Sequence, residues 1–490
     1  MPITRSQPIC SGGLAVKYLR PLPCALALIL ALSSLSLAAT QTEFAGAVSY
    51  VTGSFPIFVT TADLNKDGKM DIIAANNATN NISVLLGNGD GTFQAKIDTP
   101  ANLAPKSIAV VDFDKDGRLD LVIANAGNEG IVTVLPGRGD GTFKTPVPVT
   151  LGGNEISVAA ADLNGDGNAD IAAIDNSGTG TLWIVLGNGN MTFQTPVAYT
   201  TNVSAPTYVA LGDLNGDLKN DVVVGNSGTE SVAVFLNNGD GTLGTSVTYS
   251  TGAFTGPTSV ALGDVNLDGK LDLVASVNGH IASLLGNGDG TFQGALFSPV
   301  VINGILTLSD LNKDGWLDVA IPNSQTSVLN VMLGNGNGIF VAPQGYSTAA
   351  GPTNVAAADF NGDGFPDLVT ADFTSVPAET SVLLNAGSSL ALTISPVSLK
   401  YASQTVGTLS AKQSTKLTNT GAVAITISNV SIAGDFQFTN KCGTTLSPGA
   451  SCNINVSFQP TAVGTRLGTL TITDTAPGSP HKVSLRGNGM

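Results

Sequence analysis

Seven short acidic segments are the residues of this chain with the greatest potential for chemistry. Each follows the nine-residue pattern D-x-[DN]-x-D-G-x-x-D, with one departure, Leu218, at position six of the fourth copy. Positions one, three, five and nine of each copy carry carboxylate or amide oxygens. A turn at the position-six glycine would curl these side chains around one point, with the position-seven carbonyl as a further ligand. Hard oxygen ligands at this density suit an ion of the size of Ca²⁺, which binds six to eight oxygens.

The pattern therefore predicts one calcium site in each segment. Asp and Asn also favour turns without any metal, but seven copies in register favour the metal. The candidate ligands are Asp63, Asn65, Asp67 and Asp71; Asp112, Asp114, Asp116 and Asp120; Asp162, Asn164, Asp166 and Asp170; Asp213, Asn215, Asp217 and Asp221; Asp264, Asn266, Asp268 and Asp272; Asp310, Asn312, Asp314 and Asp318; and Asp359, Asn361, Asp363 and Asp367. Because position six needs a left-handed residue, we expect the fourth site to be the weakest.

Short apolar runs flank each acidic loop and indicate strands rather than helices. The runs have four to six residues, too few for the helices of an EF-hand, and position twelve holds Ala74 or Ile123 where an EF-hand has glutamate. A third run ends in a glycine-rich turn such as 87–91, and a more polar strand follows. Four strands in a repeat of 46 to 51 residues are typical of a β-propeller blade.

The two ends of the repeat region predict a closed ring. Phe44 precedes Asp63 by 19 residues, as Phe93 precedes Asp112, so residues 44–53 are a fourth strand with no blade before them. The seventh repeat stops near Gly387 after its third strand. An open stack would leave unpaired strand edges. We therefore predict an all-β fold with a seven-bladed β-propeller over 40–387, closed by the N-terminal strand.

The repeats resemble the FG-GAP family, also called VCBS repeats, which includes the integrin α-subunit propeller. The resemblance covers residues 44–387, where acidic loop, glycine turn and spacing recur together. It implies calcium in the loop between the first and second strands of each blade. It also implies a role in adhesion or carbohydrate binding, and it does not imply catalysis.

The remaining residues, 388–490, have a different pattern. Alternating strands over 416–419, 453–458 and 469–472 are separated by Asn-Thr-Gly and Ser-Pro-Gly turns, which predicts an immunoglobulin-like β-sandwich. The stretches 446–452 and 456–460 resemble the Hydin-like domains of bacterial choice-of-anchor proteins.

The N-terminus indicates export. Lys17 and Arg20 precede an apolar run over 22–37 and small residues, which predicts a signal peptide over 1–39 and a secreted, extracellular or cell-surface protein. The alternative, a membrane anchor, needs about 20 apolar residues, and no later span appears. Removal of the leader leaves two cysteines, Cys442 and Cys452, for which a disulfide is the simplest prediction and a catalytic thiol the alternative.

Charge and composition limit the classes of function. Between Glu43 and Gly387 there are 34 acidic and 11 basic residues, so nucleic acid is not an expected partner. The glycine turns lack the Lys-Ser/Thr of phosphate-binding loops and are interpreted as structural. With only His280 and His481 in the mature chain, we expect no enzymatic activity. The alternatives are a secreted polysaccharide lyase or hydrolase and a structural cell-surface spacer.

The turns between the second and third strands are the predicted recognition surface. They lie opposite the acidic loops and vary most between repeats, and variable loops on a regular scaffold commonly carry recognition. Asn278, His280 and Asp372 are the candidate ligand-binding residues. Because these turns are rich in Asn, Ser, Thr and Gly, a glycan or a surface protein is the expected partner.

Overall fold

The computed structural model describes residues 42–127, 130–177, 180–201, 204–252, 256–300, 304–388, 392–419, 421, 424–476 and 479–490. The predicted signal peptide lies outside these ranges. Every regular element within them is a β-strand. A search of the same residues for a helix long and apolar enough to cross a membrane finds none.

Four-stranded antiparallel sheets repeat along the chain, and six of them use four consecutive strands each. These are β3 (Pro56–Ala62), β4 (Asp71–Asn76), β5 (Asn81–Leu85) and β6 (Ile97–Pro100); β7 (Pro105–Val111), β8 (Asp120–Asn125), β9 (Ile131–Leu135) and β10 (Val147–Thr150); β11 (Glu155–Ala161), β12 (Asp170–Asp175), β13 (Thr181–Val185) and β14 (Val197–Thr200); β15 (Pro206–Gly212), β16 (Asp221–Asn226), β17 (Ser231–Phe235) and β18 (Val247–Ser250); β19 (Ser259–Gly263), β20 (Asp272–Val277), β21 (His280–Leu284) and β22 (Leu296–Pro299); and β23 (Thr307–Ser309), β24 (Asp318–Asn323), β25 (Val328–Met332) and β26 (Gln344–Ser347).

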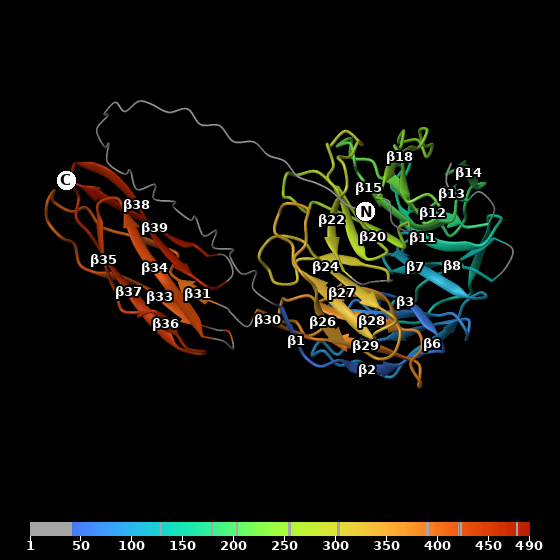
Figure 1. Cartoon of the computed structure of the whole chain (residues 1–490), viewed down its shortest axis with the longest axis horizontal. Helices are drawn as coiled ribbons and strands as arrows, with labels where there is room; N and C mark the ends of the chain where they lie inside the picture. The colour runs from blue at the N-terminus through green and yellow to red at the C-terminus, as the bar shows by residue number, and fades with distance from the viewer. Residues whose placement is uncertain are drawn as a thin grey trace, which may run out of the picture. The chain divides into compact units, whose positions relative to one another are not determined.

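The seventh sheet joins the two ends of the repeat region. It contains β27 (Pro352–Ala358), β28 (Asp367–Asp372) and β29 (Glu379–Leu383), and its fourth strand is β2 (Val48–Val51) from the N-terminal side. Residues Val48 to Val51 pair with Val382 to Glu379, so the expected pairing of the N-terminal strand is present. A further pair, β1 (Thr42–Phe44) with β30 (Asn385–Ser388), reinforces the junction. Figure 1 shows the blue β2 beside the orange β29.

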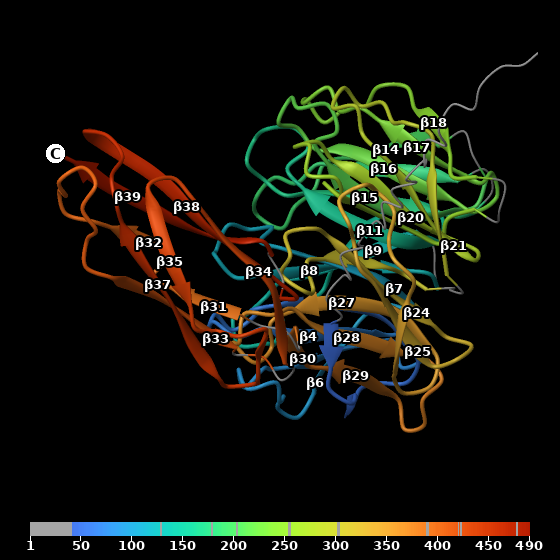
Figure 2. The same ribbon diagram turned by 60° about the vertical axis from the view of Figure 1, so that its left-hand side comes forward.

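The first strands of successive sheets contact one another around a common centre, as in a β-propeller. The series runs from β3 through β7, β11, β15, β19 and β23 to β27, and β27 contacts β3. At this last junction the backbone N–H of Val59 donates to Asn354 Oδ1 at 2.6 Å, and Thr353 Oγ1 donates to the carbonyl of Ile57 at 3.1 Å. The blue strands of the first sheet therefore lie beside the orange strands of the last (Figure 2).

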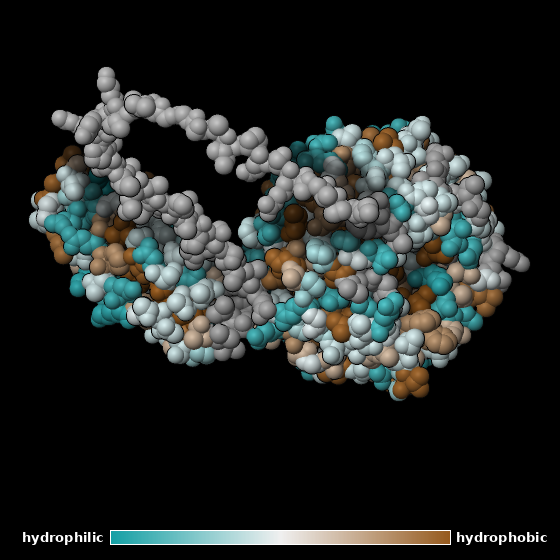
Figure 3. Space-filling model, in the orientation of Figure 1, coloured by the Kyte–Doolittle hydropathy of each residue, from teal (hydrophilic) through white to brown (hydrophobic). Residues whose placement is uncertain are grey.

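The second strands of the sheets form the middle of the core. All six residues of β4, and of its counterpart in each of the other six sheets, are buried. Both faces of each sheet pack against neighbouring sheets, so these strands lose apolar–polar alternation and read as continuous apolar runs. The outer strands have exposed positions; in β14, for example, Val197 is 48% exposed. Apolar and polar residues are interspersed on the visible propeller surface (Figure 3).

Large side chains fill the centre of the first-strand ring. Phe58, from the first sheet, is buried in a cluster against which Tyr208 and Ile305 pack. These three residues come from strands, or strand ends, on different sides of the ring. Apolar and aromatic side chains from different sheets therefore pack against one another within the first-strand ring.

Residues 392–490 form two further sheets. The first has the order β31 (Leu392–Ser395), β33 (Gln413–Asn419), β37 (Ser451–Phe458) and β35 (Phe436–Asn440). The second has the order β32 (Ser398–Lys400), β39 (His481–Gly489), β38 (Gly464–Asp474), β34 (Ile425–Ala433) and β36 (Thr445–Leu446). Side chains from both sheets, among them Leu417, Phe458 and Ile472, share one buried core. The three strand segments predicted here lie within β33, β37 and β38.

Candidate functional site

The seven acidic loops each connect the first strand of a sheet to the second, and they share one hydrogen-bonding pattern. The position-one carboxylate accepts the N–H of position six at 2.8–2.9 Å in every copy. The position-three side chain accepts the N–H of position five at 2.9–3.2 Å. The position-five carboxylate accepts the N–H of position seven at 2.7–3.1 Å. These bonds hold the three side chains against the backbone of the turn.

Two positions of each loop adopt left-handed backbone. Position six is left-handed in all copies, with φ of 80° at Gly68 and 66° at Leu218, as the sequence predicted. Leu218 is 94% exposed and still donates its N–H to Asp213 at 2.8 Å. The fourth loop therefore has the same backbone conformation as the other six. Because Leu218 is not glycine, its left-handed conformation destabilises the folded state by about 1–2 kcal/mol. Position four is also left-handed, even where it is lysine, as at Lys66 with φ of 59°; the sequence pattern did not reveal this.

The position-nine aspartate has a role that the sequence did not predict. It is fully buried in all seven copies. One carboxylate oxygen accepts the N–H of position two, and the other accepts the N–H of the second residue after the third strand. For Asp71 these donors are Leu64 and Gly87, both at 2.9 Å. The same pair of bonds recurs at 2.6–3.0 Å in the other six copies. This aspartate therefore ties the acidic loop to the glycine turn.

Burial shifts the titration of these aspartates. Desolvation raises the pKa of Asp120, Asp170 and Asp367 to about 6 and that of Asp318 to about 7. The pKa values of Asp71, Asp221 and Asp272 are raised for the same reason. The two backbone donors oppose the shift, while repulsion from the position-one carboxylate and from the carboxylate at position five (at position three, Asp114, for Asp120) adds to it. A cation in the loop would relieve that repulsion.

The second loop provides a direct test of whether the side chains fit a metal ion. Asp112, Asp114 and Asp116 each offer a carboxylate oxygen, and these oxygens lie within 4.8 Å of one another. Asp112 Oδ1 is buried and has no hydrogen-bond partner among the described residues. An all-oxygen donor set with one uncompensated buried oxygen fits a hard cation such as Ca²⁺. Lys144 Nζ lies 3.3 Å from Asp116 Oδ2 and is a local counter-charge.

The three predicted ligand-binding residues lie at the opposite ends of the sheets, but not together. Asn278 is exposed in the turn between β20 and β21, and His280 begins β21. Asp372 ends β28 in the seventh sheet and is fully buried. Its carboxylate accepts hydrogen bonds from Thr370 Oγ1 at 2.8 Å and Ser381 Oγ at 2.6 Å. The expected surface position of Asp372 is therefore wrong, because two hydroxyl donors hold its side chain inside the sheet.

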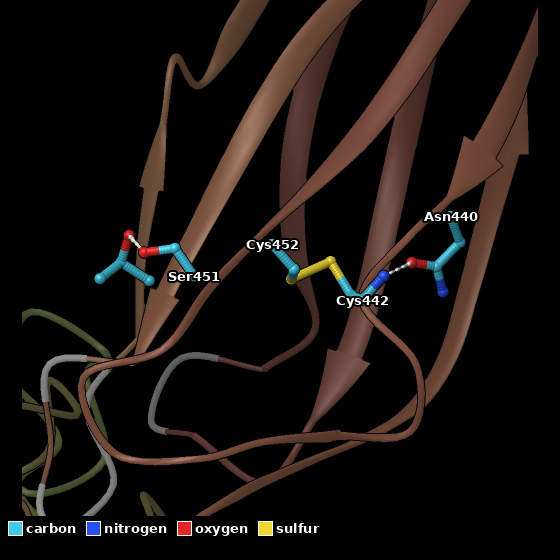
Figure 4. Close-up of a disulfide and its surroundings, with 5 residues drawn as sticks. Asn440, Cys442, Ser451 and Cys452 are labelled. Atoms are coloured by element: carbon cyan, nitrogen blue, oxygen red, sulfur yellow. Dashed lines mark hydrogen bonds between the residues drawn. A yellow bond between two sulfur atoms is a disulfide. The ribbon is translucent and has the colours of Figure 1, made fainter.

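The cysteines of the C-terminal region form the predicted disulfide. Cys442 and Cys452 are joined with a Cα–Cα distance of 4.9 Å. The N–H of Cys442 donates to Asn440 Oδ1 at 2.8 Å (Figure 4). The bond links β37 to the segment after β35, and both cysteines pack in or against the core of this region. The alternative of a catalytic thiol does not apply to a cysteine held in a disulfide.

Comparison with protein families identifies the repeats. Residues 63–123, 112–173, 162–224, 213–275 and 310–370 match a family described as FG-GAP-like repeat. These stretches cover more than half of the 490 residues. The chain thus belongs to the FG-GAP-like repeat family, and the resemblance seen in the sequence is confirmed. Residues 390–490 match a family described as Cep192 domain 4.

The solved structures below are distantly similar to this chain. No curated protein matches the chain. A solved Agrocybe aegerita lectin, described by its specific recognition of non-reducing terminal N-acetylglucosamine, is 21% identical over 69% of this chain and 86% of its own, with a TM-score of 0.46. The V. cholerae biofilm matrix protein Bap1 is 15% identical over 71% and 92%, with a TM-score of 0.41. The PapD-like domain 7 of human CEP192 is 14% identical over 20% and 84%, with a TM-score of 0.17. Scores of this size carry no functional argument.

Proposed function

We propose that this chain is a secreted, calcium-binding β-propeller that acts as an adhesion or carbohydrate-binding module at the cell surface. In this proposal the seven four-stranded sheets are the blades of one ring over residues 40–387, closed by β2, and residues 388–490 form an immunoglobulin-like sandwich. The observation that carries the proposal is the hydrogen-bonding pattern that all seven acidic loops share. A pattern kept in every copy, with oxygen ligands held against the backbone of each turn, supports a common bound ion.

In each loop, the side chains at positions one, three and five would hold the ion, together with the position-seven carbonyl. The position-nine carboxylate was also a predicted ligand, but in the second loop Asp120 is not among the three aspartates whose oxygens lie close together, and both of its oxygens accept backbone N–H groups. Calcium bound there would neutralise the clustered carboxylates. Because each loop joins the first strand of a sheet to the second, calcium binding and folding would be linked.

A binding role is better supported than a catalytic one. Carboxylates with raised pKa values are candidates for acid–base catalysis. Here, however, the position-nine aspartates with raised pKa values are fully buried, and both oxygens of each accept backbone N–H groups. Such groups are held for structure and cannot reach a substrate. We therefore propose no enzymatic activity, and the polysaccharide lyase or hydrolase remains the less supported alternative.

A glycan-array screen of the mature protein, with and without calcium, tests the proposal. We expect binding to a restricted set of glycans in calcium and loss of that binding in EDTA. Asn278→Ala and His280→Ala should weaken binding without lowering the melting temperature. A protein that melts normally in calcium and binds neither glycans nor surface proteins would support the structural spacer instead.

A further inference from the structure

A shallow hollow lies between the outer strands of the fourth and fifth sheets. It has a volume of about 400 Å³, and its lining includes Thr248, Tyr249 and Ser250 of the fourth sheet and Leu284, Gln293 and Phe297 of the fifth. Tyr249 packs edge-to-face against Phe292 with ring centroids 5.3 Å apart. This contact joins the two walls, which combine residues of strands β18, β21 and β22 with the connection 292–295.

Comparison of the repeats explains why the hollow occurs here. Gly294 stands two residues after Phe292, and a side chain added at Gly294 would meet no atom within 4 Å. The equivalent places in five of the other six sheets carry Ala95, Thr145, Thr195, Thr245 and Ala342, and the seventh sheet has Gly46. The fifth sheet therefore lacks a side chain that five of the other sheets have at this point.

Phe297 is the second departure from the repeat. It is the second residue of β22 and is 37% exposed. The second residues of the other six outer strands are Ser49, Asp98, Pro148, Ala198, Thr248 and Gly345. An exposed aromatic ring thus lies at this position in the same sheet that lacks a side chain at residue 294. The two departures together create a space with an aromatic wall.

The hollow is continuous with a residue already considered for recognition. His280 contacts Phe297 edge-to-face, with ring centroids 6.1 Å apart. Ala282 pairs directly with Phe297, and His280, Ala282 and Leu284 share one face of β21 because side chains alternate along a strand. A ligand in the hollow would therefore extend toward His280 and the turn that carries Asn278.

We propose that this hollow, defined by Gly294, Phe297, Tyr249 and Gln293, binds the neutral sugar of a glycan. This inference rests on the proposed carbohydrate-binding function and assigns it to a site. The lining contains aromatic rings, hydroxyls and one amide but no charged side chain. An aromatic face attracts the C–H face of a pyranose ring, while Thr248, Ser250 and Gln293 can hydrogen-bond its hydroxyls. The volume is within the roughly 300–1,000 Å³ of small-ligand sites.

Saturation-transfer NMR on the full mature chain in calcium tests the site. The probes are the methyl glycosides of glucose, galactose and mannose and of their neutral N-acetylamino derivatives. We expect the wild type to bind at least one probe. Gly294→Thr fills the hollow with a residue that three other repeats carry at this place, and it should weaken binding about tenfold or more. Phe297→Ala should weaken binding to a similar degree. Ala342→Thr, which introduces threonine at the equivalent place in the sixth sheet, is the matched control and should bind as the wild type does.

The outcomes separate the site from the function. If the wild type binds a neutral sugar and Gly294→Thr binds it equally well at the same melting temperature, the site is wrong and the carbohydrate-binding function stands. If the wild type binds only charged glycans, the neutral class is wrong. If it binds no glycan on the array or by NMR, both proposals fail. Loss of binding in Gly294→Thr and Phe297→Ala, with unchanged melting and normal binding by Ala342→Thr, supports the site.

Discussion

The two ends of the four-stranded sheets differ in how strictly they keep the repeat. At the acidic-loop end, three side-chain hydrogen bonds and the two bonds of the buried aspartate recur in all seven sheets. At the opposite end, the connection between second and third strands ranges from two residues in the fifth sheet to six in the seventh. Bonds kept in every copy indicate a requirement of the fold. Variation on the same scaffold indicates freedom for recognition. The hollow beside Phe297 is a separate departure, in the outer strand β22 and the segment after the glycine turn rather than in these connections.

Removal of calcium should have the largest effect, because it acts on all seven loops at once. Extracellular calcium sites often have Kd values of about 10⁻⁴–10⁻³ M. When the free calcium concentration is ten times Kd, one site stabilises the folded state by about 1.4 kcal/mol. Seven such sites would together add several kcal/mol. Melting in millimolar Ca²⁺ and again in EDTA should show a clearly lower midpoint in EDTA. An equal midpoint in both buffers would show that calcium does not stabilise the acidic loops.

The opposite end should respond to pH through Asp372. Burial raises the pKa of Asp372 to about 7, so the folded state retains a proton that the unfolded state has lost between about pH 4 and 7. The stabilisation is therefore complete below about pH 4 and is lost as the pH rises to about 7. A shift of about three units corresponds to at most about 4 kcal/mol.

Urea unfolding from pH 4 to 8 measures this dependence. Asp372→Asn places an uncharged side chain of the same size at this position. The free energy of unfolding of this variant should therefore depend less on pH between about 4 and 7 than that of the wild type. Identical profiles for the variant and the wild type would show that Asp372 ionises as freely in the folded state as in the unfolded chain.

Substitutions within the third loop should separate two roles: the backbone hydrogen bonds of the position-nine aspartate and the binding of calcium. Asp170→Asn replaces one of two acceptor oxygens with an NH₂ group that faces a backbone donor, and it should cost about 1–3 kcal/mol even in EDTA. Asp166→Asn, at the exposed position five, should reduce calcium affinity and have little effect in EDTA. Paired urea unfolding of both variants, with and without calcium, distinguishes the two roles. Equal losses in EDTA would mean that position nine is no more structural than position five.

Much of this architecture follows from local sequence, and the rest depends on contacts across the sheet. The loop pattern and the 19-residue spacing from Phe44 to Asp63 were enough to predict the strands and the pairing of β2 with the seventh repeat. The two backbone hydrogen bonds of the buried Asp71 could not be predicted from the loop pattern, because one of the donors, Gly87, is 16 residues away. Asp372 resembled a turn residue because it follows an apolar strand. The hydroxyls of Thr370 and Ser381 that hold it inside become neighbours only when β28 pairs with β29.

The smallest expected effect concerns the one loop that departs from the pattern at the conserved end. Leu218 keeps the common hydrogen bond to Asp213 but holds a left-handed backbone that costs a non-glycine residue about 1–2 kcal/mol. Leu218→Gly should remove this cost, offset in part by the greater entropy of glycine in the unfolded chain, and leave a net gain of about 0.5–1 kcal/mol. The gain should be larger in calcium if the relaxed loop also binds the ion more tightly.

Gly269→Leu, at the same position of the fifth loop, is the matched reverse change and should destabilise by a similar amount. Thermal melts of both variants with and without calcium measure these differences. If Leu218→Gly does not stabilise the protein and Gly269→Leu is neutral, position six tolerates any residue, and the fourth site has no reason to be the weakest.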